Sequence, residues 1–318
     1  MTPALFFLVA TEENPAPPGA EIAALRASDG TLLRCACWRG EAGRAGTVAI
    51  LPGRSEFIEK YFETITDLTR RGFAVAALDW RGQGGSQREL SDPRKGHIDD
   101  FSLYRRDLDA LFEHLNDQNL PRPWYALAHS MAGAILLDAV ADGETRFTRG
   151  VLSAPMVGLY GLPSQTTAQF AVRALNLFGL GGAYLPGSKG HAPSLFDPFP
   201  GNPLTSDPER YQRCAASLIA GPDLALGAPT TAWAAAAFRL MRRFADPEFG
   251  LAIACPLLFI NAGADSIVSP PVAEELASRI RGASSITIPG ARHEILFEQD
   301  RYRSQFWAAF DAFIPAAA

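Results

Sequence analysis

Ser130 has the surroundings of an enzymatic nucleophile. It lies in the segment Leu127-Ala128-His129-Ser130-Met131-Ala132-Gly133, between an expected strand and an expected helix. A serine hydroxyl is a poor nucleophile at neutral pH, and it needs a neighbouring base and an exposed position. A sharp turn from strand to helix supplies this exposure where small residues let the two elements approach. Ala128 and Ala132 stand where such turns usually carry glycine, and a slightly wider turn would accept their methyl groups. Taken alone, the serine could equally cap the helix.

His293 is the expected general base. In enzymes with such a turn, the acid and then the base follow the nucleophile along the chain. Only His191 and His293 follow Ser130 in the sequence. His191 lies in a Pro- and Gly-rich segment with no strand before it, whereas His293 lies in a turn, residues 289–294, directly after the last expected strand. A base in that turn can reach over the edge of a sheet, so the sequence favours His293. We expect His129, beside the nucleophile, to be structural.

Asp265 is the expected acid of the same site. It follows the apolar run Leu258-Phe259-Ile260, so it lies near the end of an expected strand. An aspartate in this role orients the imidazole and stabilises the imidazolium without taking its proton. The alternative, an N-cap for the helix after Pro270-Pro271, would need a residue later in the chain. The other aspartates between nucleophile and base lie in expected helices or in the Pro- and Gly-rich segment: Asp138, Asp142, Asp197, Asp207, Asp223 and Asp246.

Two backbone N–H groups are expected to form an oxyanion hole, the pair of donors that stabilises the negative oxygen formed during acyl transfer. One is the N–H of Met131, the residue after the nucleophile. The other should come from the turn at residues 52–56, where we assign the N–H of Arg54 and expect Gly53 to supply an unusual backbone conformation. The Gly-rich loop 79–86 lacks the Gly-Lys-Ser/Thr signature of a phosphate-binding loop, so we expect it to brace the nucleophile loop.

Strands and helices alternate around these motifs. Strand-like segments lie at 21–27, 31–38, 47–51, 73–78, 124–128, 150–154, 256–260 and 284–288, with helical spacing of apolar residues between most of them. This alternation predicts an α/β fold, a mainly parallel sheet covered by helices on both faces. Residues 21–156 and 251–318 would form this core, and residues 1–20 an N-terminal lead-in whose Pro- and Glu-rich part, residues 11–20, should be mobile. The alternation stops within residues 157–250, which we interpret as an inserted helical cap.

Composition excludes several classes of protein. The 318 residues carry a formal net charge of -5 with scattered Lys and Arg, which gives no basic surface for nucleic acid. No segment offers the roughly 20 apolar residues of a membrane span, and no basic residue precedes the apolar run 3–10 as a secretory signal would require. The run 4–8 could contact a membrane surface, although packing onto the body is the favoured interpretation.

The four cysteines show no metal-type clustering in the sequence. Cys35 and Cys37 alternate along one expected strand, so they point to the same face and cannot easily form a disulfide. We therefore expect buried free thiols in a reducing, cytoplasmic compartment, and neither a metal nor an organic cofactor.

Taken together, these residues resemble the bacterial lysophospholipase and monoacylglycerol lipase branch of the α/β-hydrolases. Family members usually keep glycine at the positions of Ala128 and Ala132, and many monoacylglycerol lipases have His-Gly where this chain has Pro52-Gly53. The Pro-Gly-Arg form is more similar to the lysophospholipases. The matching stretches are 52–57 with Lys60-Tyr61, 79–86, Asp92-Pro93 with Gly96-His97, 128–133, 154–156 and His293-Glu294.

The resemblance implies a serine hydrolase that cleaves the ester of a single-chain glycerolipid, a lysophospholipid or a monoacylglycerol, through an acyl-enzyme. It implies no cofactor and no obligate protein partner, with action in the cytosol or at the inner face of a membrane. The acyl chain would lie under the cap. Candidate residues for that tunnel, each of which could instead pack within the cap, are Phe170, Leu175, Phe178, Trp233 and Leu240.

Two kinds of rival remain open. One is another enzyme on the same scaffold: a carboxylesterase, a thioesterase or an aminopeptidase. Aminopeptidase relatives bind a free amine with acidic residues of the cap, and Asp207 and Glu209 could serve, although both flank Pro208 as at a helix start. The other rival is a binding protein without activity, which the two alanines beside Ser130 would favour and the intact Ser, Asp and His set opposes.

Overall fold

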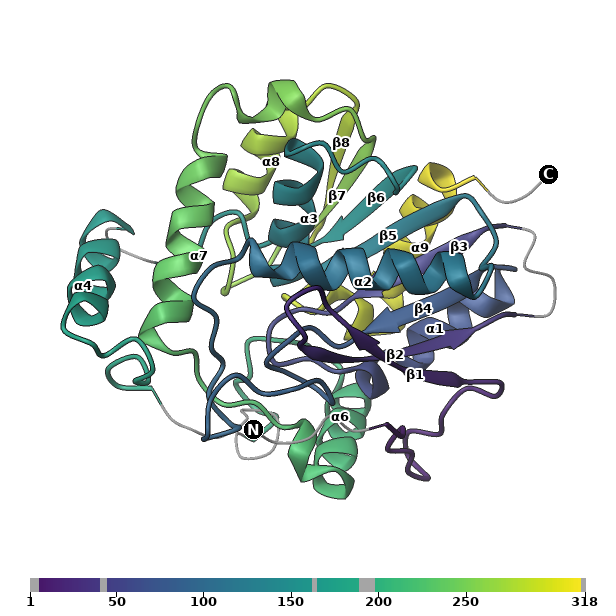
Figure 1. The fold of residues 1–318 in the computed structure, drawn as a ribbon. Helices are drawn as coiled ribbons and strands as arrows, with labels where there is room; N and C mark the ends of the chain where they lie inside the picture. The colour runs from purple at the N-terminus through teal and green to yellow at the C-terminus, as the bar shows by residue number, and fades with distance from the viewer. Residues whose placement is uncertain (1–5, 41–44, 162–164, 189–197, 316–318) are drawn as a thin grey trace.

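The alternating elements form the predicted α/β sheet. The structure, a computed structural model, describes residues 6–40, 45–161, 165–188 and 198–315. Within these ranges eight strands form one sheet in the order β1-β2-β4-β3-β5-β6-β7-β8 (Figure 1). The strands are β1 (Glu21–Arg26), β2 (Leu32–Trp38), β3 (Thr47–Leu51), β4 (Ala74–Leu78), β5 (Trp124–His129), β6 (Arg149–Ser153), β7 (Leu257–Ala262) and β8 (Ala283–Ile288).

The strands from β3 to β8 pair in parallel, whereas β1 pairs with β2 and β2 with β4 in antiparallel fashion. Strands β3, β4, β5 and β7 are buried along their whole length, as expected of strands covered on both faces. Because the parallel strands share one direction, the turns after β3, β5, β7 and β8 all lie at the same edge of the sheet. The sequence places its candidate residues in these four turns.

Helices cover both faces of the sheet (Figure 1). Helices α1 (Phe62–Arg70) and α9 (Asp300–Phe313) lie together on one face, where Arg303 of α9 pairs with Asp67 of α1. Helices α2 (Leu103–Asp117), α3 (Met131–Ala141) and α8 (Pro270–Arg279) cover the other face. Helix α3 is buried along almost its whole length because it packs under the centre of the sheet.

Between β6 and β7 the chain leaves the sheet, and the described residues of this segment include the α-helices α4 (Gln165–Leu177), α6 (Pro208–Ala220) and α7 (Thr231–Phe244). The Asp207 side chain caps α6 by accepting from the N–H groups of Glu209 and Arg210, and Thr230 caps α7 in the same way. Asp207 is therefore a helix-start residue, as its position beside Pro208 indicates. Residues 157–250 are called the cap below, and the division of the chain at these two residues remains a prediction.

The described part of the lead-in, residues 6–20, packs onto the body, contrary to the mobility predicted for residues 11–20. Val9 and Asn14 are buried, and both contact Glu59: the Val9 N–H donates to its carboxylate at 3.0 Å and the Asn14 amide to its carbonyl at 2.8 Å. The same carboxylate pairs with the fully buried Arg34 of β2. Buried charges need such partners, and the lead-in supplies part of their enclosure. The pattern of Pro and Glu residues hid this packing.

In the apolar run at the N-terminus, Phe6 and Phe7 are half exposed while Leu8 packs against the core. Of the described residues of this run, Leu8 and Val9 pack onto the body as predicted, whereas Phe6 and Phe7 do not. None of the helices in the described ranges is both long enough and apolar enough to cross a lipid bilayer.

Candidate active site

Ser130 lies on a strained turn between β5 and α3. Its backbone has φ 51° and ψ −112°, a conformation that non-glycine residues rarely adopt. Two hydrogen bonds hold the turn: the Ser130 N–H donates to the Ser153 carbonyl and the Met156 N–H donates to the Ser130 carbonyl, each at 2.9 Å. Such strain is kept only where the surroundings fix it, and it lifts the hydroxyl above the strand ends.

Gly133, and not the residue at position 132, provides the close contact in this turn. Ala128 and Ala132 are fully buried and fit without displacing their surroundings. A Cβ atom on Gly133, however, would lie 2.7 Å from Cβ of Pro155, closer than real side chains come. The missing glycines are therefore replaced by one glycine a single position later, against the segment that follows β6.

The three predicted residues Ser130, Asp265 and His293 lie together. Nε2 of His293 is 3.0 Å from Oγ of Ser130, and Nδ1 of His293 is 2.7 Å from Oδ2 of Asp265. The second carboxylate oxygen of Asp265 accepts from the N–H groups of Ile267 and Val268 at 2.7 and 3.0 Å. Burial alone would raise the pKa of Asp265, but the bonds from His293 and these two N–H groups outweigh it and lower the pKa. A charged carboxylate thus orients a base that contacts the hydroxyl.

A second layer of buried charges lies directly behind these residues. The Glu56 carboxylate accepts from His129 at 3.1 Å, from the hydroxyl of Tyr61, and from Lys60 at 2.8 Å. Lys60 also pairs with Glu294, the neighbour of His293. Burial opposes the charge on Glu56, but His129 and Lys60 outweigh it and hold the pKa of the carboxyl well below its usual range.

His129 is tied to this layer and not to the hydroxyl of Ser130. Its Nε2 lies 3.3 Å from the carbonyl oxygen of His293. Burial lowers the pKa of His129, but the Glu56 carboxylate outweighs it, and the pKa lies above its ordinary value. The structural role expected of His129 agrees with these contacts. Glu56, Lys60 and Glu294 were not among the predicted site residues, and their only sequence signal was the set of stretches that carry the family resemblance.

The turn after β3 faces the nucleophile and carries the N–H of Arg54. Loop 79–86 braces this turn: the Gln83 amide donates to the Gly53 carbonyl at 2.7 Å and the Trp80 indole to the Pro52 carbonyl at 2.8 Å. These hydrogen bonds of the loop support the turn after β3, whereas the sequence led us to expect that the loop braces the nucleophile loop. Gly53 is needed for space and not for an unusual backbone angle, because a Cβ there would lie 2.8 Å from Nδ1 of His129.

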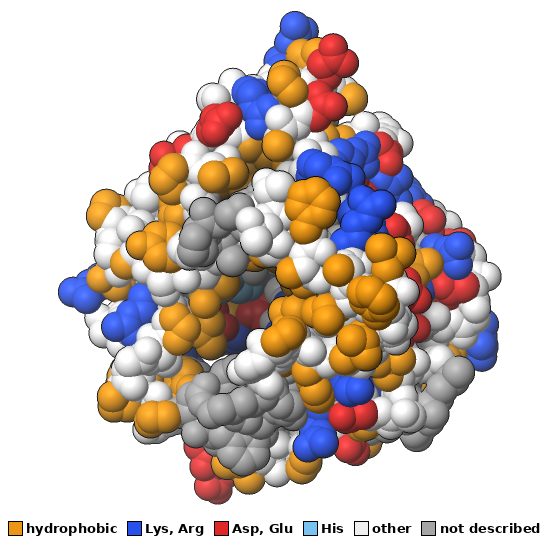
Figure 2. Space-filling model, turned by 90° about the vertical axis from the view of Figure 1, so that its left-hand side faces the viewer, with side chains coloured by type: hydrophobic (Ala, Val, Ile, Leu, Met, Phe, Trp, Pro, Cys, Tyr) orange, Lys and Arg blue, Asp and Glu red, His pale blue; other side chains and the backbone are white. Residues whose placement is uncertain are grey.

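A cavity of about 260 Å³ opens above Ser130. The cavity opens on the face shown in Figure 2, where a hollow has His and acidic side chains at its floor and apolar side chains around its rim. The polar floor comes from the core. Most of the wall is apolar and comes from both core and cap: Met156, Leu159, Leu204, Tyr211, Trp233, Ile267, Val268 and Phe297.

Only one of the five predicted tunnel residues, Trp233, lines this cavity. Phe170 and Phe178 are exposed over 68% and 83% of their surface, on or just after α4. Leu240 is buried in the hydrophobic core, and Leu175 is half-buried on α4 away from the cavity. The prediction that these four line the cavity disagrees with their positions, because helical spacing identifies an apolar face but not its neighbour.

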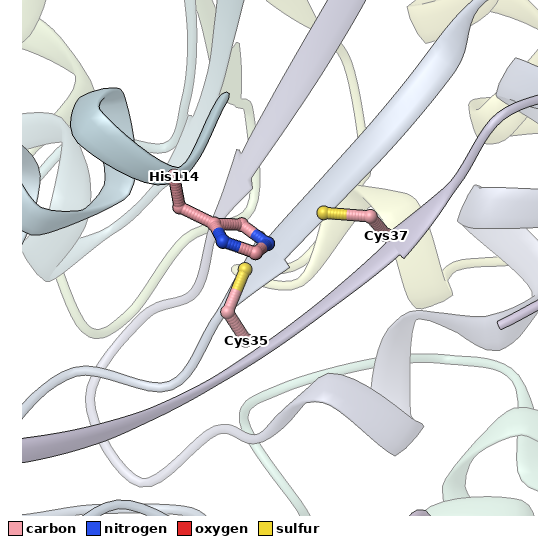
Figure 3. A group of neighbouring side chains, drawn as sticks. All are labelled: Cys35, Cys37 and His114. Atoms are coloured by element: carbon pink, nitrogen blue, oxygen red, sulfur yellow. The ribbon is translucent and has the colours of Figure 1, made fainter. Parts of the chain in front are cut away.

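One group of side chains outside the cavity could hold a metal ion. Cys35 and Cys37 of β2 lie beside His114 of α2, and the ligand atoms all lie within 4.8 Å of one another (Figure 3). The expectation that the cysteines form no metal-type cluster is corrected here: the sequence spacing of Cys35 and Cys37 gave no sign of His114, which the fold brings in from a helix.

Comparison with known proteins places the chain in a family. The profile of the family described as serine aminopeptidase, S33, matches residues 43–300. Lysophospholipase L2 of Escherichia coli (strain K12) is 33% identical over 282 residues, which span 81% of this chain and 76% of that protein. Monoglyceride lipase of Rattus norvegicus is 29% identical over 152 residues, 47% of this chain and 48% of that protein.

The fold is also that of a solved lipase. The crystal structure of a soluble variant of monoglyceride lipase from Saccharomyces cerevisiae, in complex with a substrate analog, superposes with a TM-score of 0.74 and 18% identity, covering 96% of this chain and 98% of that one. The chain therefore belongs to the serine aminopeptidase S33 family and is an α/β-hydrolase of the lysophospholipase and monoglyceride lipase type.

Proposed function

We propose that this carboxylic ester hydrolase cleaves the ester of a single-chain glycerolipid, with Ser130 as nucleophile, His293 as general base and Asp265 as the acid that orients it. The observation that carries the proposal is the hydrogen-bonded chain from Asp265 through His293 to Ser130 at the floor of a cavity with an apolar wall. The curated relatives, a lysophospholipase and a monoglyceride lipase, support the substrate class.

In the first half of the reaction, Oγ of Ser130 attacks the ester carbonyl while Nε2 of His293 takes the hydroxyl proton. The N–H groups of Met131 and Arg54 donate to the negative oxygen of the tetrahedral intermediate. Met131 is the first residue of α3, where N–H groups have no partner within the helix. Loss of one such donor typically costs about 10²–10³ in rate.

The intermediate then collapses to an acyl-enzyme. His293 donates its proton to the departing glycerol oxygen, and the bond between that oxygen and the acyl carbon breaks. In the second half, His293 takes a proton from water as the water oxygen attacks the acyl carbon. His293 then gives this proton to Oγ of Ser130 as the bond between Oγ and the acyl carbon breaks, which releases the fatty acid and restores the Ser130 hydroxyl. The negative charge of Asp265 stabilises the imidazolium at both stages.

An aminopeptidase is the rival that the family description suggests, and it would need a free carboxylate for the substrate amine. Asp207 and Glu209 lie at the start of α6, where Asp207 caps the helix and pairs with Arg210. Glu56 and Glu294 do line the cavity, but Lys60 pairs with both. Each of these candidate acids that lines the cavity already has a buried cation, which favours the ester over the amine.

We also propose that the cap meets a lipid surface. The exposed side chains of Phe170, Leu177 and Phe178 lie along α4 and its end, on the side of the molecule where the cavity opens. A large apolar face left in water by a monomer is typical of an interaction surface. The substrate lies in lipid aggregates, and the face would let the enzyme take it from there.

Labelling with a fluorophosphonate probe tests the nucleophile. We expect the wild-type protein to be labelled at Ser130 and the Ser130→Ala variant to remain unlabelled. Thr64→Ala, at a buried hydroxyl of α1 that does not line the cavity, is the control for folding and handling. Hydrolysis of aminoacyl amides in preference to lysophospholipid, monoacylglycerol and short p-nitrophenyl esters would contradict the substrate class. An unlabelled wild-type protein would contradict the enzyme mechanism itself.

A further inference from the structure

One cation on the cavity wall has no carboxylate partner. Lysine and arginine side chains line the cavity at three positions: Lys60, Arg210 and Arg54. Lys60 pairs with Glu56 and Glu294, and Arg210 pairs with three carboxylates. Arg54 forms an ion pair with none of the carboxylates in the described part of the chain. Arg54 is therefore the lining cation whose charge no carboxylate of the described residues neutralises.

The guanidinium of Arg54 is held in place but incompletely bonded. Nη2 donates to the Gly227 carbonyl, and the guanidinium carbon lies 5.4 Å from the centre of the Trp233 ring. Nε is buried and has no hydrogen-bond partner among the described residues. Burial lowers the pKa of Arg54 to about 10, so the group is still charged at neutral pH. A buried donor without a partner costs stability unless a ligand satisfies it.

We propose that the Arg54 side chain binds the phosphate of a lysophospholipid head group, and that this contact makes the enzyme prefer lysophospholipids to monoacylglycerols. The inference rests on the proposed function. The backbone N–H of Arg54 would donate to the carbonyl oxygen of the scissile ester. The side chain of the same residue extends from there along the cavity wall. In a lysophospholipid the phosphate is separated from that ester only by the glycerol. A guanidinium offers parallel donors that match phosphate oxygens, whereas a monoacylglycerol has only neutral hydroxyl and ester oxygens and no anion to pair with the charge.

The test compares two substrates that share an acyl chain: octanoyl-lysophosphatidylcholine and 1-monooctanoylglycerol, both kept below their micelle concentrations. We expect the wild-type kcat/KM to be higher for the lysophospholipid. Arg54→Ala should lower the ratio of the two kcat/KM values on the order of 10–100-fold, the range for a hydrogen bond to a charged group. Arg54→Lys, which keeps the charge but not the fork, should recover part of the ratio.

Arg94→Ala is the matched control, because Arg94 is exposed, pairs with Asp92 and does not line the cavity. Its ratio should equal that of the wild type. An equal fall for both substrates in Arg54→Ala would show that Arg54 only supports the turn, and it would overturn the phosphate site. Wild-type activity on the monoacylglycerol but not on the lysophospholipid would overturn it as well, while leaving the proposed function intact. Inactivity on both would contradict the proposed function.

A second observation, independent of the active site, concerns the group of Cys35, Cys37 and His114. The two cysteines are almost fully buried and point to the face of β2 that α2 covers. His114 belongs to the last turn of α2, and its ring points from the helix toward both sulfur atoms (Figure 3). All three ligand atoms lie within 4.8 Å of one another, so small side-chain movements bring them to zinc-binding distances.

We infer that Cys35, Cys37 and His114 bind a zinc ion, with water as the fourth ligand. Thiolate and imidazole are the ligands that zinc prefers. Two thiolates balance the charge of Zn²⁺, so the bound group would be neutral, which suits a buried place. Binding releases both thiol protons to solvent. The half-buried His114 provides the side from which ion and water can enter.

The electrostatics agree with this assignment. Hydrogen bonds from Cys35 and then from His114 lower the pKa of the Cys37 thiol to about 6 despite its burial. The pKa of Cys35 is raised well above its usual value by the same pair interaction and by burial.

The zinc site is tested on the full-length protein after removal of metal and reloading with Zn²⁺ or Co²⁺. We expect one zinc per chain, and with Co²⁺ the near-ultraviolet charge-transfer band of thiolate ligands. Cys35→Ser with Cys37→Ser should lose both, while Cys214→Ser, at a half-buried cysteine elsewhere, should keep them. Lack of zinc and of the cobalt band in the wild-type protein would overturn the site even if the double variant did not fold. Two thiols missing from a titration of the metal-free denatured protein would indicate a disulfide and overturn it too.

Discussion

The core and the cap contribute to the cavity in different ways. The core fixes its polar floor, where each of Ser130, Asp265 and His293 follows a strand and has a hydrogen-bond partner at 3.0 Å or less. The cap supplies parts of the wall but leaves much of α4 in solvent, with Phe178 exposed over 83% of its surface. Chemistry needs positions fixed to a fraction of an ångström, whereas an acyl chain needs only an apolar surface of suitable width.

This difference implies that substitutions in the core should act on the rate of the chemical steps, and substitutions in the cap on substrate binding. The two regions meet at Trp233, which lies on α7 of the cap and packs edge-on against Phe101 of the core at 5.6 Å. Five substitutions, ordered by the size of the expected effect, test this division.

Removal of the nucleophile should have the largest effect. Ser130→Ala leaves no oxygen to form the acyl-enzyme, and loss of this group typically lowers kcat by about 10⁴–10⁶. Single-turnover hydrolysis of a p-nitrophenyl ester measures the loss. The substrate should still bind, because the cavity wall is unchanged. A residual rate within about tenfold of the wild type would mean that another residue attacks the ester.

Asp265→Asn should lower kcat by about 10³–10⁴, since the amide no longer orients His293 or stabilises its charged form. The lowered pKa of Asp265 also links this residue to stability. Its contribution is present above the unfolded-state pKa of about 4 and is lost as pH falls through the folded-state pKa. Urea unfolding at several pH values should show this acid-side loss in the wild type and not in the variant. An equal change of the unfolding free energy with pH in both proteins would show that Asp265 is not charged in the folded protein.

Gly133→Ala should lower the free energy of unfolding by about 1–3 kcal/mol, because its methyl group would overlap Pro155. Movement of the turn to relieve this contact should also displace Ser130. Ala132→Gly is the matched change one position earlier, and we expect it to keep activity, because the alanine methyl is accommodated but not needed. Urea unfolding and esterase assays on both variants measure the difference. A loss of activity in Ala132→Gly alone would mean that the alanine methyl has a role in the turn.

Trp233→Ala should raise KM by about tenfold while kcat changes little, because it removes a large apolar surface from the wall and leaves the floor intact. The effect should grow with acyl length in a series of p-nitrophenyl esters. Trp233→Phe should recover most of the affinity. A fall in kcat with constant KM would instead show that the cap helps to position the reacting groups.

The core could be predicted from the sequence because strand ends leave a clear signal. Apolar runs followed by Ser130, Asp265 and His293 identify one edge of the sheet, and the structure brings these residues together. The cap could not be predicted in the same way. The same helical spacing that marks Leu240 as apolar marks Phe178 as well, yet one lies in the core and the other in solvent.

Contacts between distant segments were equally hidden. Nothing near Cys35 and Cys37 in the sequence points to His114, and nothing near Asn14 indicates its bond to Glu59. Gly133 differs from these cases, because it lies within the sequence motif around Ser130. The usual pattern, however, has its glycine at the neighbouring position 132. Local spacing predicts elements and their ends, whereas long-range packing decides which side chains meet.

The smallest effect is expected at the exposed end of the cap. Phe170→Ala with Phe178→Ala removes two side chains that contact mainly solvent, so stability should change by less than about 0.5 kcal/mol and kcat/KM for short soluble esters by less than about twofold. Hydrolysis of lysophospholipid presented in vesicles should fall more, because the proposed membrane contact is lost. Leu251→Ala, at a residue that is 78% exposed outside the cap, controls for the loss of any exposed apolar side chain. An equal fall for soluble and vesicle substrates would mean that α4 closes over the acyl chain during the reaction, and the division between a catalytic core and a binding cap would then need a moving helix.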